Sequence, residues 1–129
     1  MLVIDKMSRK PIYEQLVEGL EREIVTGLMK EGEQLPSIRE LSVTLGMNPN
    51  TVQKAILELD RLGVVVSSPG RGVFVAENAV AVIRQGMAGR ITQIKEIACE
   101  LARAGVDREA ILRAIADAYD SVSEKGDTI

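Results

Sequence analysis

Two helix beginnings stand close together in residues 37–62, which read SIRELSVTLGMNPNTVQKAILELDRL. Ser37 is followed three residues later by Glu40, and this Ser-x-x-Glu pattern is typical of a capping box at the start of a helix. Gly46 stands where such a helix would end. We therefore expect a first short helix over residues 38–45.

The second helix begins only a few residues later. Asn48 is a favourable N-cap, and Pro49 is favourable in the first helical position. Apolar residues at helical spacing then continue to Leu62, which predicts a helix over residues 49–62. Its buried side is expected to carry Val52, Ala55, Ile56, Leu59 and Leu62. Two helices joined by so short a turn are typical of a helix-turn-helix, although many small helical hairpins without a DNA role share the pattern.

A β-hairpin is expected directly after these helices. Residues 64–66 and 73–75 are two short runs rich in β-branched side chains, and the six residues between them include two glycines. A hairpin in this position is the wing of a winged helix-turn-helix. Its tip carries one long cation, Arg71, which can enter a narrow minor groove or bind a phosphate. Taken alone, the tip is better explained as an ordinary tight turn with a solvated arginine.

Three more helices are expected outside this region. One begins near Pro11 and ends at Gly27 or in the region of Gly32, one covers about residues 79–104, and one follows Asp107. The last two carry apolar stripes that two helices cannot cover by themselves. The first domain is one candidate to cover them, but we favour a second copy of the chain. The residues expected in this dimer contact are Ile83, Met87, Ile91, Ile94, Ala98, Leu101, Ile111, Ile115 and Tyr119.

Composition narrows the classes of protein. The chain has 129 residues, enough for one ordinary domain, or for one small domain with an appended helical element. It contains no histidine and one cysteine, Cys99, which excludes histidine-based catalysis, histidine metal ligands and an internal disulfide. The sequence lacks an apolar run of membrane-spanning length and a signal peptide, so we expect a cytoplasmic protein with no membrane partner. We expect no cofactor and no metal.

The charge balance limits how the chain could bind a polyanion. The net charge is −3, but residues 37–75 contain four basic and three acidic residues, so that this part has 4 − 3 = +1. Long-range attraction to nucleic acid would be weak. Any contact with DNA must therefore depend on a few well-placed cations and hydrogen-bonding side chains.

Four blocks of sequence together resemble the winged helix-turn-helix of GntR-family bacterial transcription regulators. They stand in the family's order within about residues 8–77 and read PIYEQ at 11–15, LPSIREL at 35–41, NPNTVQK at 48–54 and GRGVFV at 70–75. The remainder is similar in size to the YtrA subfamily, which carries two short helices in place of a large effector domain. The resemblance implies a mostly α fold with a small β-hairpin wing, followed by a two-helix C-terminal dimerisation element.

The resemblance also implies which residues touch DNA. They lie at the start of the first helix of the motif, on the outer side of the second helix, and at the wing tip: Ser37, Arg39, Asn48, Asn50, Thr51, Gln53, Lys54, Gly70, Arg71 and Gly72. For Arg39, a surface ion pair with a nearby glutamate is the alternative interpretation. Some family members carry arginine where this chain has Pro49 or Gln53, so their operator preference should not be transferred.

The function expected from these observations is that of a sequence-specific DNA-binding transcription regulator, most plausibly a repressor. The expected organisation is a DNA-binding domain at 1–77 and a dimerisation segment at 78–129, with a homodimer binding a palindromic operator on double-stranded DNA. The alternative is a winged-helix protein-interaction module without a DNA role, although such a surface should expose aromatic residues or methionine. An enzyme is disfavoured because no nucleophile–base pair or phosphate loop is present. No effector ligand can be inferred from the sequence.

Overall fold

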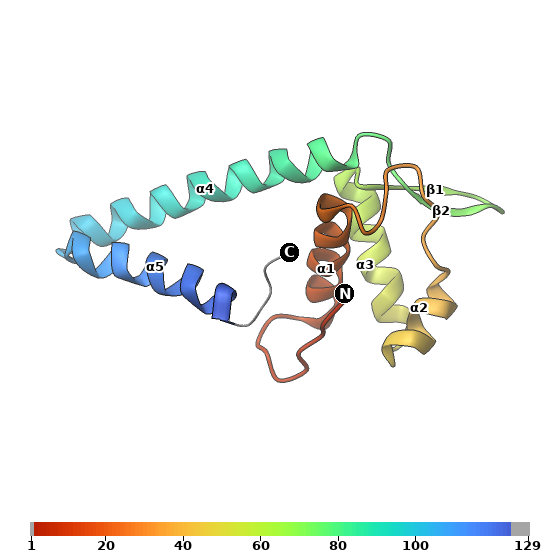
Figure 1. The fold of residues 1–129 in the computed structure, drawn as a ribbon, viewed down its shortest axis with the longest axis horizontal. Helices are drawn as coiled ribbons and strands as arrows, with labels where there is room; N and C mark the ends of the chain where they lie inside the picture. Colours follow the sequence, from red (N-terminus) through yellow and green to blue (C-terminus); the bar gives the residue numbers. More distant parts are fainter. Residues whose placement is uncertain (1, 125–129) are drawn as a thin grey trace. The chain divides into compact units, whose positions relative to one another are not determined.

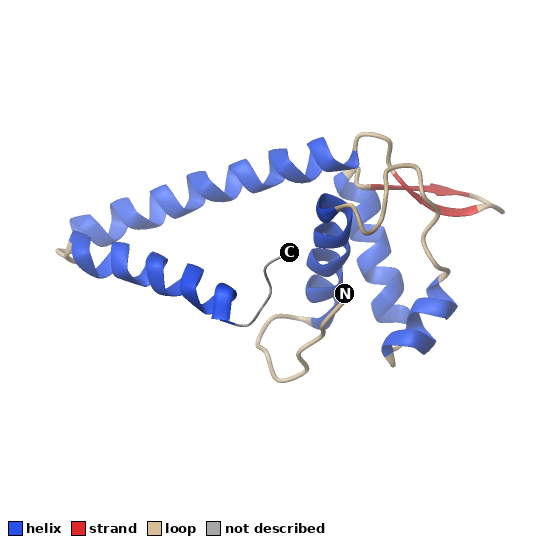
Figure 2. Ribbon diagram, in the orientation of Figure 1, coloured by secondary structure: helices blue, strands red, loops and turns tan. Residues whose placement is uncertain are grey.

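The computed structural model describes residues 2–124, which contain five helices and one two-stranded antiparallel sheet (Figures 1 and 2). The element order is α1 (Ile12–Thr26), α2 (Ile38–Leu45), α3 (Pro49–Leu62), β1 (Val65–Ser68), β2 (Gly72–Val75), α4 (Ala79–Arg103) and α5 (Arg108–Glu124). Clustering of contacts divides the chain into two compact units, Met1–Gln85 and Gly86–Ile129. We call the first unit the head and describe each unit by itself.

The expected fold class is confirmed, and α2 and α3 have the bounds that their capping residues predict. The Ser37 hydroxyl accepts a hydrogen bond from the Glu40 N–H at 3.1 Å, and the Glu40 carboxylate accepts one from the Ser37 N–H at 3.3 Å. Asn48 caps α3 through its side-chain oxygen, which accepts from the Asn50 N–H at 2.8 Å. These caps satisfy N–H groups that have no partner within the helix.

The core of the head lies between α1, α3 and the sheet. Leu16 and Leu20 of α1, Leu59 of α3 and Val75 of β2 are each at most 2% exposed. They belong to one apolar cluster that also holds residues from α2 and the start of α4. Burial of these side chains fixes which side of α3 faces outward.

A third, irregular segment pairs with β2 at the edge of the sheet, which the sequence did not reveal. The Gly32 N–H donates to the Val75 oxygen at 2.9 Å, and the Leu35 N–H donates to the Val73 oxygen at 2.8 Å. Gln34 forms an isolated antiparallel bridge with Phe74. The loop before α2 is thereby tied to β2, so the wing is anchored to the head on one side.

The structure differs from the sequence-based expectations at the start of α4. The head, as a compact unit, extends through residue 85, beyond the boundary expected at residue 77. Ile83, expected in the dimer contact, is only 3% exposed and belongs with Ala79 to the core of the head. The first turns of α4 therefore belong to the head, because Ala79 and Ile83 contribute to its apolar core.

The second unit is an open helical pair. It consists of the later part of α4 and all of α5, which are joined by a turn that contains Gly105 (Figure 1). Of the residues expected in the dimer contact, Met87, Ile91, Ile94, Ile115 and Tyr119 are exposed in the isolated chain, and Ala98, Leu101 and Ile111 are half-buried. Most of this apolar surface therefore has no cover within the described chain.

Candidate nucleic-acid interface

Polar side chains occupy the outer side of α3. Val52, Ala55, Ile56 and Leu59 are buried, and residues between them point away from the core because of the helical period. Asn50, Gln53 and Lys54 are exposed, whereas Thr51 is half-buried. The side chains that the sequence placed on this face therefore share one accessible surface, which presents amide and ammonium groups.

The start of α2 contributes one free cation. Arg39 is exposed in the first turn, where the capping box holds the helix. Arg39 forms no ion pair with the side chains described for residues 2–122, so the alternative of a pair with a nearby glutamate is not seen. Its guanidinium group is available to a phosphate or a base edge.

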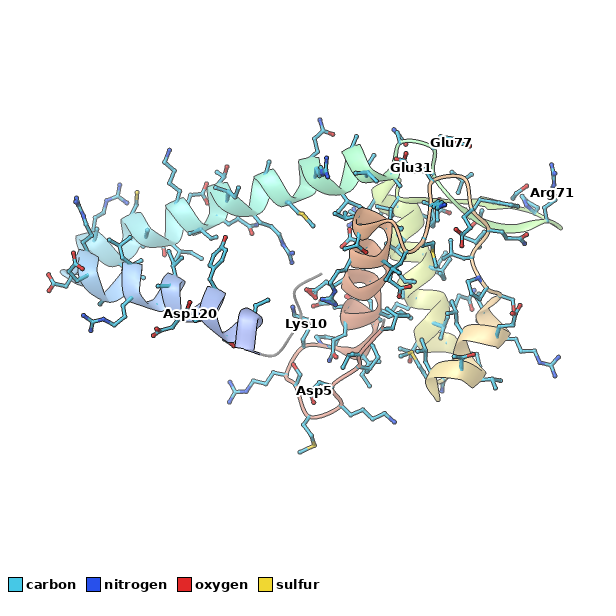
Figure 3. The ribbon with its side chains drawn as sticks, viewed as in Figure 1. Asp5, Lys10, Glu31, Arg71, Glu77 and Asp120 are labelled. Atoms are coloured by element: carbon cyan, nitrogen blue, oxygen red, sulfur yellow. The ribbon has the colours of Figure 1, made fainter. Side chains whose placement is uncertain are left out.

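The wing carries Arg71 at its tip, at the far end of the hairpin from the helices (Figure 3). The Arg71 N–H donates to the Ser68 oxygen at 3.0 Å, and the Gln34 side-chain amide donates to the Arg71 oxygen at 2.9 Å. Gly70 and Gly72 on either side adopt φ values of +75° and +124°. The backbone of the tip is thus held in a defined shape, while the guanidinium group stays exposed.

An open groove connects the wing with the start of α2. Its lining includes Ser37 and Arg39 from one side and Arg71 from the other, together with the carboxylates of Glu33 and Glu40. The outer side chains of α3 do not line this groove. Two of the three predicted contact regions therefore meet in one groove, and α3 presents the third beside it.

Lys54 has an aromatic partner that the sequence did not predict. Its ammonium nitrogen lies 4.2 Å from the centre of the Tyr13 ring in the first turn of α1, a cation–π contact. Tyr13 is half-buried and packs against the apolar core cluster of the head. Partial burial, and then the charge of Glu14, raise the pKa of the Tyr13 phenol above its ordinary value.

Sequence reasoning missed Gln34 and the role of Tyr13. Gln34 stands just before the capping box, with no local pattern to connect it with a wing 37 residues later. Tyr13 is one of only three aromatic residues in the chain, and this rarity is the only sequence feature that could have drawn attention to its contact with Lys54.

Other kinds of site find no support in the described part of the chain. Residues 2–124 contain no group of three or more carboxylate or thiol side chains placed to hold a metal ion. None of their helices is both long and apolar enough to cross a membrane.

The fold and the exposed groups define a class of protein. Two helices joined by a short turn, followed directly by a hairpin wing and carrying polar side chains on the second helix, make a winged helix-turn-helix regulator. The chain belongs to the gntR family of bacterial regulatory proteins, whose family model matches residues 12–75. It is a transcription regulator and not an enzyme.

Similar proteins extend the match beyond the head. The chain is 39% identical over 112 residues to the HTH-type transcriptional repressor YtrA of Bacillus subtilis, covering 86% of each protein. Among solved structures, a GntR family transcriptional regulator from Listeria monocytogenes is 30% identical with a TM-score of 0.66, covering 88% of this chain and 98% of that one. The DNA-binding domain of AraR in complex with its operator ORX1 is 31% identical with a TM-score of 0.53, covering 58% of this chain and 93% of that one.

Proposed function

We propose that this chain is a repressor that binds a palindromic operator as a homodimer. In this proposal α3 enters the major groove and the wing tip lies at the minor groove. The observation that carries the proposal is the exposed polar face of α3, with Asn50, Gln53 and Lys54, beside a wing whose tip presents Arg71. The proposed place of action is the cytoplasm, where a bacterial chromosome lies.

The side chains on α3 have the chemistry for reading bases. The amides of Asn50 and Gln53 can each donate to and accept from adenine in the major groove. Arg39 and Lys54 supply positive charge for phosphates, and the net charge of residues 37–75 is only 4 − 3 = +1. With so little non-specific attraction, most of the affinity must come from specific contacts.

The operator is expected to be palindromic because the second unit favours a two-fold dimer. Ile91 is 67% exposed, Ile94 54% and Tyr119 76% in the isolated chain. Single exposed apolar side chains are common on protein surfaces, but several large ones on the same helical pair are typical of an interaction surface. A second copy offers an identical apolar surface, and two-fold pairing is the commonest way to bury one. Repression is proposed because the similar protein from Bacillus subtilis is called a repressor.

Selection from a random pool of DNA duplexes by the full chain tests the proposal. We expect an enriched palindrome whose half-sites lie about one helical turn, roughly 10 base pairs, or a multiple of it apart. An Asn50→Ala, Gln53→Ala double variant should lose the enrichment while keeping its helical circular dichroism. A wild-type chain that enriches no sequence at low or high salt would instead be a protein-interaction module, and a single asymmetric site would contradict the dimer.

Sedimentation of an Ile94→Glu variant tests the dimer separately. Losing one buried isoleucine costs about 1.5–3 kcal/mol on each subunit, so the dimer dissociation constant should rise at least about a hundredfold. Leu28→Glu is the matched control, because Leu28 is also exposed, at 62%, but lies in the head. Equal dissociation constants for the two variants would contradict the proposed interface.

A further inference from the structure

The loop before α1 is rich in positive charge. Residues 6–10, which we call the basic loop, contain Lys6, Arg9 and Lys10, and all three side chains are exposed. Asp5, beside the loop, stabilises the loop conformation, because its carboxylate accepts a hydrogen bond from the Met7 N–H at 2.9 Å. The loop thus has as many basic residues as all of residues 37–70, although it is only five residues long.

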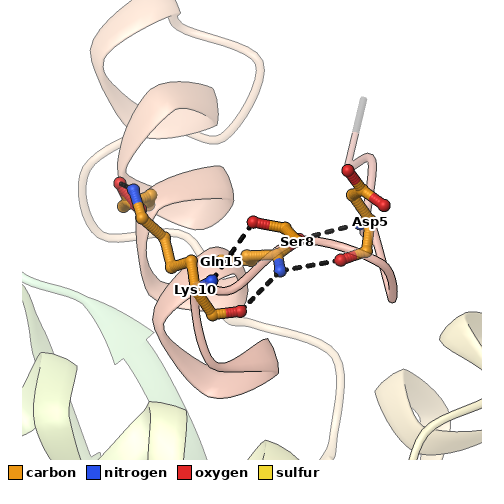
Figure 4. Close-up of polar contacts among 5 residues, drawn as sticks. Asp5, Ser8, Lys10 and Gln15 are labelled. Carbon is orange, nitrogen blue, oxygen red and sulfur yellow. Dashed lines mark hydrogen bonds and ion pairs between the residues drawn. The ribbon is translucent and has the colours of Figure 1, made fainter.

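The basic loop is held in a fixed shape by the side chain of Gln15 (Figure 4). The Gln15 amide oxygen accepts from the Asp5 N–H at 2.7 Å, and its nitrogen donates to the Asp5 and Lys10 oxygens, both at 2.9 Å. The Ser8 hydroxyl accepts from the Lys10 N–H at 3.2 Å. A loop that is ordered before binding loses little conformational entropy when it meets a ligand.

The three cations of the basic loop do not have the same role. The Lys10 ammonium group lies 2.7 and 2.8 Å from the two carboxylate oxygens of Glu18 on α1. The positive charge of Lys10 is therefore balanced by the negative charge of Glu18. Lys6 and Arg9 have no ion pair with the described side chains of residues 2–122. Two cations therefore remain available to an anion.

The basic loop is connected through the first turn of α1 to the face of α3 that is proposed to read DNA. It leads directly into the first turn of α1, where the Tyr13 ring contacts the Lys54 ammonium group of α3 at 4.2 Å. The loop, the start of α1 and the start of α3 lie at the same end of the head (Figure 1). The positive end of the α1 dipole also lies in this first turn, where Pro11 provides no side-chain cap.

We propose that Lys6 and Arg9 of the basic loop bind backbone phosphates of the duplex just outside the bases that α3 reads. This inference rests on the proposed DNA-binding function and adds a contact that neither α3 nor the wing supplies. The ligand is assigned as a phosphodiester backbone because Lys6 and Arg9 supply positive charge at the end of the head, whereas the amides that suit base reading lie on α3. Such a contact raises affinity without changing base preference.

A salt titration of the full chain on the selected operator tests this contact. For a Lys6→Ala, Arg9→Ala variant, the slope of log affinity against log salt should fall by about 1.8, since each phosphate contact contributes about 0.9. An Arg22→Ala, Lys30→Ala variant removes the same charge from exposed positions later in the head and should keep the wild-type slope. Circular dichroism should show the same folded content for both variants.

A second duplex locates the contact. On an operator shortened to the bases that α3 and the wing cover, the wild type and the Lys6, Arg9 double variant should bind with the same slope. Equal slopes on the long duplex, or the same loss on both duplexes, would overturn the flanking contact while leaving the proposed function intact. A wild-type chain that does not prefer the selected operator over a random duplex would overturn both.

Discussion

Replacing Gly72 by alanine should destabilise the head more than any other single methyl group added to the wing tip. Gly72 has φ +124°, outside the narrow left-handed region that other residues use. A methyl group at this position would also overlap the side-chain amide of Gln34, which donates to the Arg71 oxygen. The substitution therefore both strains the backbone and displaces the side chain that anchors the tip.

The expected loss can be estimated from these two effects. Backbone strain at a non-glycine residue in a sparsely populated region costs about 1–3 kcal/mol. Losing the Gln34 hydrogen bond adds about 1 kcal/mol. The free energy of unfolding should therefore fall by about 2–4 kcal/mol, measured by urea denaturation at one fixed protein concentration.

Gly70→Ala is the matched control for this substitution. Gly70 has φ +75°, close to the left-handed region, and no atom lies within 4 Å of the place where its methyl group would stand. It should cost only about 1–2 kcal/mol. Adding Gln34→Ala to Gly72→Ala should cost less than the sum of the two single changes, because the overlap is gone. Equal losses at Gly70 and Gly72, with full additivity at Gln34, would refute the reasoning.

Three further outcomes are expected. Arg39→Ala should lower the salt dependence of DNA binding by about one unit of slope if its guanidinium binds a phosphate, and an unchanged slope would contradict this role. Gln53→Ala should relax base preference at one position of each half-site by about 1–3 kcal/mol with little change in slope, which competition among single-base variants of the operator would measure. In a Tyr119→Phe background, phenolate absorbance should show Tyr13 titrating above pH 10, because its pKa is raised, and Glu14→Gln should lower the midpoint. Since Tyr13 in the unfolded chain ionises at about pH 10, its contribution to stability is present below that pH and is lost as pH rises toward the higher folded pKa.

The helix-turn-helix could be read from the sequence because its determinants are local. Ser37 with Glu40, and Asn48 with Pro49, fix where α2 and α3 begin, and the apolar period fixes which side of α3 is buried. The exposure of Asn50, Gln53 and Lys54 follows from that period alone. Their contact with DNA stays a prediction.

The features that the sequence did not predict depend on contacts between distant parts of the chain. Ile83 fits the apolar period of α4 as well as Ile91 does, and a period does not tell whether the head or another molecule covers a side chain. Gln34 reaches Arg71 only because the loop before α2 pairs with β2. The Tyr13–Lys54 contact likewise depends on how α1 packs against α3, which neither helix encodes separately.

The wing leaves one edge of its small sheet open. Within the described chain β1 pairs with β2 alone, so the other edge of β1 carries backbone groups that could template a strand from another molecule. That edge is only four residues long, Val65–Ser68, and Pro69 follows it at once. Proline cannot donate to a growing ladder, so the hairpin can stay extended into solvent without recruiting neighbouring molecules into aggregates.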